Sequence, residues 1–217
     1  NYNIFIMNDS NKKKGVMLVL SSPSGAGKSS ICKSLMSLDT NLSLSISTTT
    51  RKKRPNENSG EDYFFVSTEK FKEMLSNNHF LEHASVFDNY YGTDKSLVEK
   101  KINNGEDLIF DIDWQGAQQL REKMREDIVS IFILPPNKKE LERRLKSRGQ
   151  DSAKVVKKRM DGASAEITHW AEYDYVVINE DLNQSVKAVL VILKAERMKR
   201  TRQEGLVEFV RSITHDF

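Results

Sequence analysis

Two kinds of apolar pattern alternate along the chain. Short unbroken apolar runs are typical of strands buried on both faces, whereas apolar residues that recur every three or four positions indicate amphipathic helices. The predicted strands are residues 16–20, 108–113, 128–134 and 175–178, with shorter ones at 40–47 and 63–66. The predicted helices are residues 31–38, 67–75, 95–104, 115–124, 138–148, 155–170 and 182–200. This alternation predicts an α/β fold whose parallel sheet is covered on both faces.

Two polar segments interrupt the alternation. Residues 48–93 begin with a basic loop over 48–60 and continue as a small mixed unit. Residues 137–168 form highly charged helices, the first of which is expected to begin at the cap Asn137. Such a core with two insertions resembles an enzyme that closes over two substrates. We therefore expect an N-terminal extension (1–15), two insertions (48–93 and 137–168) and a core (16–47, 94–136 and 169–217).

A glycine-rich loop separates the first predicted strand from the first predicted helix. Residues 21–30 read Ser-Ser-Pro-Ser-Gly-Ala-Gly-Lys-Ser-Ser, which in this position is typical of a phosphate-binding loop. Gly25 and Gly27 let backbone N–H groups point at an anion, and the helix N-terminus beneath adds its positive dipole end. Lys28 is expected to reach the outer phosphates and Ser29 to ligate Mg²⁺. The usual glycine five residues before Gly27 is a serine here, so a flexible turn that binds nothing is the alternative.

Composition narrows the function classes. The 217 residues are 38% hydrophobic and 30% charged, which suits a globular protein of one or two domains. A formal charge of +3 is too small to indicate nucleic acid binding. No apolar stretch approaches the length of a membrane span, and the apolar run at residues 4–7 is too short for a signal peptide. The single cysteine, Cys32, fits a reducing compartment, and its place in a helix favours a buried thiol over a nucleophile.

Two further groups of residues point to chemistry but leave alternatives open. Arg51 and Arg54, followed by Tyr63, suit a phosphomonoester because the planar arginine fork matches phosphate oxygens. The alternative for these residues is a solvated basic turn. Asp111 and Asp113 lie at the end of a predicted buried strand, where acids commonly help to hold Mg²⁺ in phosphate-loop enzymes.

Several motifs, in order and at matching spacing, resemble those of the guanylate kinase family. The loop at residues 22–29 resembles that family's phosphate loop, in which the early glycine is often absent. The other motifs are residues 45–54 with 60–63, residues 80–84 with 89–93, and residues 111–116. The resemblance extends from about residue 16 into the last predicted helix. It implies a three-layer phosphate-loop kinase core with a GMP-binding insertion over residues 48–93 and a helical lid over residues 137–168.

The resemblance implies roles for residues of the first insertion and its borders. The GMP phosphate ligands would be Arg51, Arg54, Tyr63 and Tyr91. Glu82 would recognise guanine, because one carboxylate can accept from both N1–H and N2–H₂. The residues beside it would be Ser47, Thr93 and Asp113. Without the resemblance, the sequence around Glu82 favours an exposed acid in a loop.

The resemblance also implies a site for ATP and Mg²⁺. The ATP-binding residues would be Ser24, Gly25, Ala26, Gly27, Lys28, Ser29, Ser30 and, through its backbone, Asn179. Ser29 and Asp111 would ligate the metal. The catalytic residues would be Lys28, Arg51 and the lid arginines Arg144, Arg148 and Arg159. Catalysis is expected to be mostly positioning and electrostatic stabilisation, because charge spreads over the oxygens of the transferring group.

The sequence is thus identified as a member of the guanylate kinase family, cytoplasmic enzymes of purine nucleotide metabolism that transfer the γ-phosphoryl group of ATP to GMP or dGMP. The expected partners are these nucleotides, without nucleic acid or membrane, and assembly into a homo-oligomer is left open. Intact Lys28 and Ser29 disfavour the rival reading as an inactive protein-interaction domain. The cluster at Arg51 disfavours a GTPase. Glu82 with Ser47 separates the chain from other nucleotide kinases.

Overall fold

The computed structural model describes residues 13–86, 88–147 and 153–215, which are built around a five-stranded sheet. Its strands are β1 (Met17–Ser21), β2 (Leu42–Leu44), β7 (Asp107–Asp111), β8 (Ile128–Leu134) and β9 (Tyr175–Ile178). Their order is β2-β7-β1-β8-β9, and every pairing is parallel. In the register, Met17 of the central strand β1 lies opposite Leu108 and Ile128. The predicted α/β fold with a parallel sheet is confirmed.

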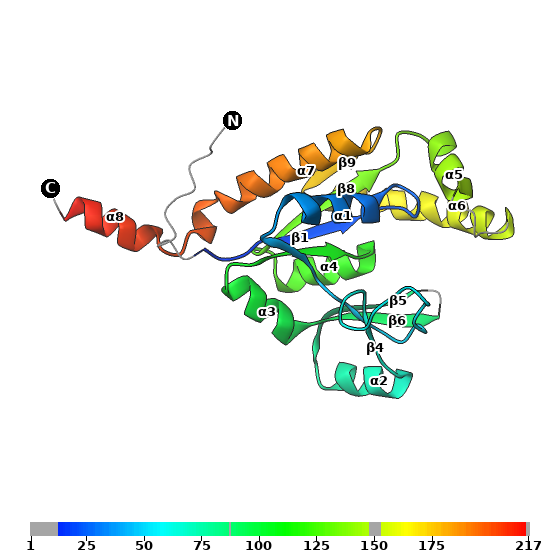
Figure 1. Ribbon diagram of the computed structural model, residues 1–217, viewed down its shortest axis with the longest axis horizontal. Helices are drawn as coiled ribbons and strands as arrows, with labels where there is room; N and C mark the ends of the chain where they lie inside the picture. The colour runs from blue at the N-terminus through cyan, green and yellow to red at the C-terminus, as the bar shows by residue number, and fades with distance from the viewer. Residues whose placement is uncertain (1–12, 87, 148–152, 216–217) are drawn as a thin grey trace.

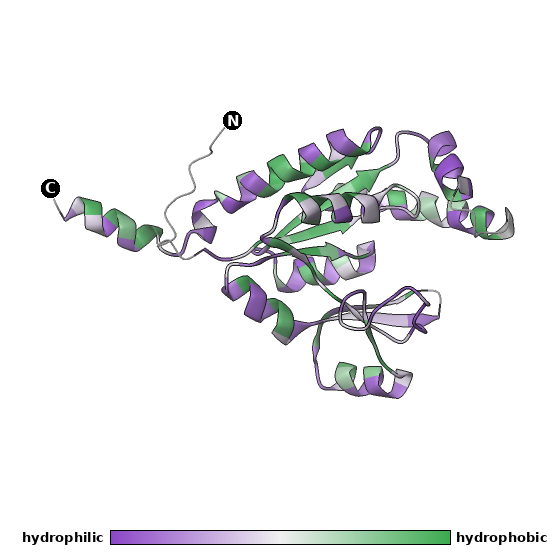
Figure 2. Cartoon of the chain, in the orientation of Figure 1, coloured by the Kyte–Doolittle hydropathy of each residue, from purple (hydrophilic) through white to green (hydrophobic). Residues whose placement is uncertain are grey.

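Helices cover both faces of this sheet (Figure 1). On one face lie α1 (Lys28–Leu38) and α7 (Leu182–Arg197), and on the other α3 (Lys95–Asn103) and α4 (Trp114–Lys123). Leu18 and Leu20 of β1 pack in the core on the first face, whereas Met17 and Val19 pack on the second. All four side chains are fully buried, and Figure 2 shows the apolar strands between helices with polar outer surfaces. A strand buried on both faces holds the loop that follows it in a fixed place.

A second, four-stranded sheet is formed by the chain between β2 and α3. Its strands are β3 (Thr48–Thr49), β4 (Phe64–Phe65), β5 (Phe80–Val86) and β6 (Asn89–Asp94), in the order β4-β3-β6-β5. It is mixed, because β3 pairs parallel with β4 and antiparallel with β6. The helix α2 (Thr68–Ser76) packs on it through Phe71, which stacks on Phe80 with ring centroids 4.6 Å apart. The small mixed insertion predicted from the sequence is therefore present.

A pair of helices follows β8. α5 (Lys138–Ser147) and α6 (Ala153–Ile167) share a small apolar cluster that includes Leu141 and Leu145. As predicted, Asn137 caps α5, because its side chain accepts from the N–H of Glu140 at 2.9 Å. Figure 1 shows the pair beyond the end of the sheet toward which β1 points.

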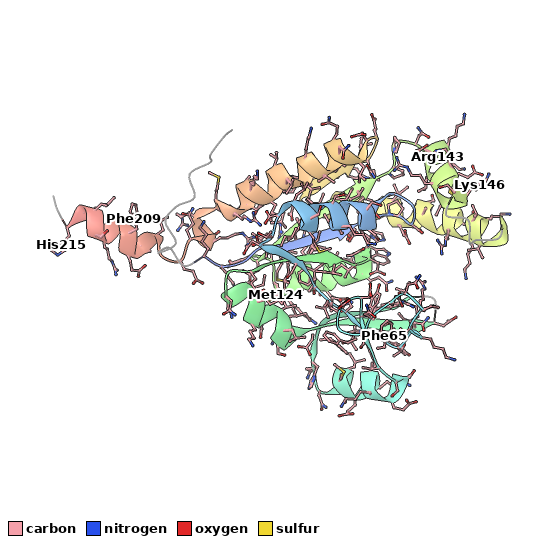
Figure 3. All side chains as sticks on the ribbon, in the orientation of Figure 1. Phe65, Met124, Arg143, Lys146, Phe209 and His215 are labelled. Atoms are coloured by element: carbon pink, nitrogen blue, oxygen red, sulfur yellow. The ribbon has the colours of Figure 1, made fainter. Side chains whose placement is uncertain are left out.

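The last part of the chain departs from the predicted helices. The helix predicted over 155–170 ends at Ile167 and continues as the 3-10 helix η1 (Thr168–Glu172). The helix predicted over 182–200 ends at Arg197, and two elements follow it: η2 (Arg200–Arg202) and α8 (Leu206–Thr214), which was not predicted. The chain turns here because Arg202 is buried and donates to the carbonyl of Asp127 at 3.1 Å. Figure 3 shows Phe209 on α8 and His215 directly after it, and α8 extends away from the sheet.

The structure also bears on the expectations from composition. Cys32 is buried on α1, and burial raises the pKa of its thiol to about 12, so the expected buried thiol is confirmed. Within the described residues, none of the helices combines the length and the apolar character needed to cross a membrane. Most of the predicted N-terminal extension, residues 1–12, lies outside the described residues.

A cluster of charges fastens α7 to the sheet. Asp107, at the start of β7, is buried and accepts from the N–H of Val16 at 2.7 Å and from Arg197 at 2.6 Å. Arg197 also donates to Asp39, just beyond α1, at 2.6 Å. The last turn of α7 is thereby tied to β1, β7 and the end of α1.

We expect Arg197→Met to destabilise the fold, because it leaves the carboxylate of Asp107 buried without its cation. The loss should be about 2 kcal/mol in the free energy of unfolding, measured in urea, since removing one partner of a buried pair is strongly destabilising. Lys187→Met, at an exposed position of the same helix, is the control and should change stability by less than about 0.5 kcal/mol. Equal stability of the two variants would contradict this account of the cluster.

Candidate active site

The loop between β1 and α1 has a conformation that suits phosphate. Gly25 and Gly27 have φ angles of +93° and +100°, in the left-handed region that favours glycine. A Cβ atom on Gly27 would lie 2.3 Å from the amide nitrogen of Asn179, so a larger residue would collide there. That amide donates to the carbonyl of Ala26 at 2.7 Å and holds the loop against the segment after β9. The helix α1 begins directly after the loop, so its first backbone N–H groups lie next to it, which is the arrangement of anion sites at helix N-termini.

Lys28 and Ser29, the first residues of α1, face Asp111 at the end of β7. The Nζ atom of Lys28 lies 2.7 Å from Oδ1 of Asp111 and donates to the carbonyl of Ile112 at 2.8 Å. The hydroxyl of Ser29 donates to Oδ2 of Asp111 at 3.0 Å. Burial opposes both charges, but their attraction outweighs it, raising the pKa of Lys28 and lowering that of Asp111. The predicted loop lysine, serine and acid are thus brought together.

Arg51 lies against aromatic rings of the second sheet. Its guanidinium is 5.3 Å from the ring centroid of Tyr63 and 5.8 Å from that of Phe65, and its side chain is only 16% exposed. Nη2 of Arg51 donates to Glu57 at 2.6 Å, which raises the pKa of Arg51 and lowers that of Glu57. The alternative of a solvated basic turn is therefore wrong for Arg51.

Arg54 does not join this cluster. Its side chain is 73% exposed, and its Nη1 lies 4.0 Å from Glu57, so in this conformation Arg54 matches the solvated turn. Tyr91 does join, because its ring meets that of Tyr63 edge-on with centroids 6.0 Å apart. Burial and the charge of Asp111 raise the pKa of Tyr63, whereas Arg51 and Lys28 lower it. The phenol of Tyr63 therefore lies within electrostatic reach of both the arginine cluster and the phosphate loop.

Glu82 is a buried residue of β5, so the alternative of an exposed acid in a loop is wrong. Its side chain is 3% exposed and accepts from the hydroxyl of Thr93, on the paired strand β6, at 2.5 Å. A Cβ on Gly116, near the start of α4, would lie 2.7 Å from Oε2 of Glu82, so the glycine leaves room for this carboxylate. Burial raises the pKa of Glu82 to about 7, and nearby Asp113 adds to the rise, although Thr93 and Lys123 oppose it. An acid held like this favours a partner that donates hydrogen bonds to it.

Asp113 and Ser47 each lie a few residues after a strand of the first sheet, β7 and β2 respectively. Asp113 caps α4 by accepting from the N–H of Gly116 at 3.0 Å, which keeps its carboxylate near Glu82. Ser47 precedes β3, and its carbonyl accepts from the N–H of Phe64 at 2.9 Å. The role of both residues beside guanine stays a prediction.

The helix pair α5 and α6 reaches the phosphate loop through Arg144. This residue donates to the carbonyl of Asn179 at 2.9 Å and to that of Ala26 at 3.3 Å, and Glu140 holds its Nε at 2.7 Å. Arg159 lies half-buried on α6. Arg148, the third predicted lid arginine, lies outside the described residues. Ser24 lies in the loop and Ser30 in the first turn of α1, and their predicted contact with ATP stays a prediction.

Two carboxylates at the site were not predicted. Glu57 holds Arg51, and an acid six residues after Arg51 within a basic turn was the available signal. Glu166, on α6, accepts from the N–H of Ser24 at 3.1 Å across a sequence separation of 142 residues, and no spacing in the sequence indicates that contact.

Two oxygen ligands suitable for a hard cation lie close together beside the phosphate loop, at a place that is partly open to solvent. Ser29 and Asp111 supply a hydroxyl and a carboxylate beside the phosphate loop, and oxygen ligands of this kind suit Mg²⁺ when substrate phosphates complete the shell. Among the described residues, no group of three or more His, Cys, Asp and Glu side chains is arranged to hold a metal by itself.

This parallel sheet, with a phosphate loop after its central strand and two further units beside it, defines the class of phosphate-loop α/β kinases. A family model described as guanylate kinase matches residues 14–196. The chain therefore belongs to the guanylate kinase family, which confirms the resemblance seen in the motifs.

Guanylate kinases from other organisms are similar to this chain in sequence and structure over nearly its whole length. The guanylate kinase of Paramagnetospirillum magneticum is 54% identical over 198 residues, which cover 91% of this chain and 92% of the relative. That of Bradyrhizobium diazoefficiens is 53% identical over 205 residues, or 94% of each chain. The crystal structure of guanylate kinase from Anaplasma phagocytophilum superimposes with a TM-score of 0.77 at 42% identity, covering 93% of this chain and 96% of the other.

The raised pKa of Glu82 predicts a pH-dependent stability. The folded protein holds this proton up to a pKa of about 7, whereas the unfolded chain releases it near 4.5. Between these values the folded state binds more protons, so stability should fall as the pH rises. Relative to Glu82→Gln, the wild-type protein should lose on the order of 3 kcal/mol between pH 4.5 and 8.

Urea unfolding of the ligand-free protein across this pH range measures the difference. Glu208→Gln, at an exposed position of α8, is the control and should follow the wild-type profile. Parallel profiles for the wild type and Glu82→Gln would show that Glu82 keeps an ordinary pKa in the fold.

Proposed function

We propose that this protein transfers the γ-phosphoryl group of ATP to GMP, giving ADP and GDP. The observation that carries the proposal is the buried Glu82, bonded to Thr93 in the sheet whose aromatic cluster lies within electrostatic reach of the phosphate loop. Family membership supports the same reaction. dGMP is also an acceptor in this proposal, because it has the same base.

The second sheet, within residues 48–93, binds GMP. Arg51 and the hydroxyls of Tyr63 and Tyr91 bind the acceptor phosphate, and Arg54 turns in from solvent to complete the set. Glu57 orients Arg51 by holding one side of its guanidinium, and this contact supports a site preorganised for a planar two-point contact with phosphate.

Guanine is recognised by Glu82. Its carboxylate accepts from N1–H and N2–H₂, while Thr93 and Ser47 offer hydroxyls and Asp113 borders the site. Adenine presents the reverse pattern of donors and acceptors on that edge. A carboxylate removed from water and left without donors is costly, so the site rejects adenine.

The core and the lid, residues 137–168, bind ATP. The phosphate loop from Ser24 to Ser30 surrounds the phosphates, with N–H groups that follow Ser24 directed at them, and Lys28 contacts the outer ones. Asn179 borders the adenine through its backbone. The lid arginines Arg144, Arg148 and Arg159 approach the transferring group from the opposite side. Together these cations stabilise the charge that spreads over the oxygens of that group in the transition state.

Mg²⁺ is the cofactor in this proposal, held by Ser29 and, with ATP phosphates, by Asp111. When bound, it neutralises charge on the β- and γ-phosphates. The acceptor oxygen of GMP is already anionic, so the residues of the chain need to position it rather than remove a proton. No covalent intermediate is required. Closure of the second sheet and the lid over both nucleotides excludes water and so limits wasteful hydrolysis of ATP.

The reaction belongs to purine nucleotide metabolism, and we place the enzyme in the cytoplasm, where its substrates and a reducing environment for Cys32 are found. Small-molecule nucleotides are its partners in this proposal, without nucleic acid or membrane. The proposal is compatible with either a monomer or a homo-oligomer.

An ADP-release assay with GMP, dGMP, IMP, AMP, CMP and UMP as acceptors tests the function. We expect GMP and dGMP to be used, IMP to fall below them because it lacks the N2 amine, and AMP to have a specificity constant lower by as much as about 10⁴-fold. Glu82→Gln should narrow the gap between GMP and AMP, mainly by harming GMP. Glu73→Gln, exposed on α2 of the same insertion, should leave the ranking unchanged. If AMP rivals GMP in the wild type, the assignment to guanylate is wrong.

The role of Lys28 is tested separately. Lys28→Ala should lower kcat by at least about 10²-fold, because a preorganised charge is lost from the transition state. Lys33→Ala, at an exposed position of the same helix, should keep wild-type turnover. Unfolding curves establish that both variants fold. Near-normal turnover in folded Lys28→Ala would remove Lys28 from the catalytic residues.

A further inference from the structure

Glu166 makes a contact with the phosphate loop that the proposed reaction does not yet use. It lies in the last turn of α6, and its Oε2 accepts from the backbone N–H of Ser24 at 3.1 Å. The side chain is half-buried, and burial raises its pKa while the loop hydrogen bond and Lys28 lower it. A hydrogen bond from the lid helix to the backbone of the loop can fix the position of one against the other.

The same helix carries Arg159. Arg159 and Glu166 are about two turns apart on α6, so they project from the same side of the helix. Their separation along the axis is roughly 10 Å at the helical rise per residue. A contact between Glu166 and the loop therefore fixes how the side of α6 that carries Arg159 is oriented toward the phosphate loop.

A second contact from the lid also reaches the loop. Arg144 of α5 donates to the carbonyl of Ala26 at 3.3 Å, two residues after Ser24. The lid thus holds the loop at two points: Glu166 accepts from the N–H of Ser24, and Arg144 donates to the carbonyl of Ala26. Two such points restrict rotation of the helix pair, whereas one point would leave the pair free to pivot about it.

We propose that Glu166 is a positioning residue for phosphoryl transfer, which anchors α6 to the phosphate loop so that Arg159 is aligned with the transferring group. The inference rests on the proposed function, because it assumes that Arg159 acts on ATP phosphates. Glu166 acts through its acceptor oxygen rather than through its charge. Small displacements of a catalytic group can cost on the order of 10²-fold in rate, so the anchor affects kcat.

Steady-state kinetics of Glu166→Ala and Glu166→Gln test the proposal. Glu166→Ala removes the acceptor and should lower kcat by roughly tenfold or more, with the KM for GMP unchanged, since the acceptor site is on the second sheet. Glu166→Gln retains an amide oxygen for the Ser24 N–H and should restore most of the lost kcat. Glu142→Ala removes an acid of α5 whose side chain is 44% exposed and contacts Lys146, and this variant should behave as wild type.

A double-mutant cycle with Arg159→Ala separates positioning from general loss of structure. If Glu166 acts through Arg159, then Glu166→Ala should add little to the defect of Arg159→Ala. Additive effects, equal defects in Glu166→Ala and Glu166→Gln, or a wild-type kcat in folded Glu166→Ala would each overturn the proposal. Absence of GMP phosphorylation by the wild-type enzyme would instead overturn the proposed function.

Discussion

The site depends on the burial of β1 on both faces. The strand has no freedom to shift between the two layers of helices, so the loop that leaves it at Ser21 starts from a fixed point. Because β1 and β7 are parallel neighbours, their carboxyl ends lie side by side, and Lys28 from one segment meets Asp111 from the other at 2.7 Å. The hydroxyl of Ser21 and the ammonium of Lys28 also share the carbonyl of Ile112 as acceptor. Loop, cation and acid are therefore placed by the same strand pairing.

Three of the cations that would bind phosphate are held by carboxylates of the protein itself. Asp111 holds Lys28, Glu57 holds Arg51 and Glu140 holds Arg144, all at 2.6 to 2.7 Å. These partners offset the cost of keeping positive charges close together and partly out of water. They also restrict long side chains to one geometry, which is what electrostatic catalysis by preorganised groups requires.

Glu82 shows the opposite case, a buried acid that forms no salt bridge with any cation in the described part of the chain. Burial and Asp113 together raise its pKa, so the fold carries a group that is costly to ionise. The cost of burying this carboxylate is explained if a guanine base donates hydrogen bonds to it when the substrate binds. Local features that disagree with the rest of a fold are common at functional sites, where stability is exchanged for recognition.

The sequence alone was enough for the parts that depend on local pattern. Unbroken apolar runs predicted β8 and β9 at their observed bounds, because a strand buried on both faces leaves no alternation to blur its ends. The phosphate loop was equally clear, because the left-handed φ angles at Gly25 and Gly27 and the Lys28 that follows are properties of adjacent residues. Motif spacing then identified the family and its candidate residues.

Only the tertiary structure decided which of those residues meet. Residues 80–86 lack a decisive period, and it is antiparallel pairing with β6 that makes Glu82 a buried residue of β5. The helix predicted through residue 200 stops at Arg197, since Arg202 is drawn into the core to satisfy distant carbonyls. Glu57 lies only six residues from Arg51 and could have been found from that spacing, whereas Glu166 was missed because its contact is made only in the packed structure. A carboxylate is recognised as part of a site by the donor it faces, and for Glu166 that donor lies 142 residues away along the chain. Local pattern determines where strands, helices and loops form, whereas contacts between distant side chains exist only once those elements have packed.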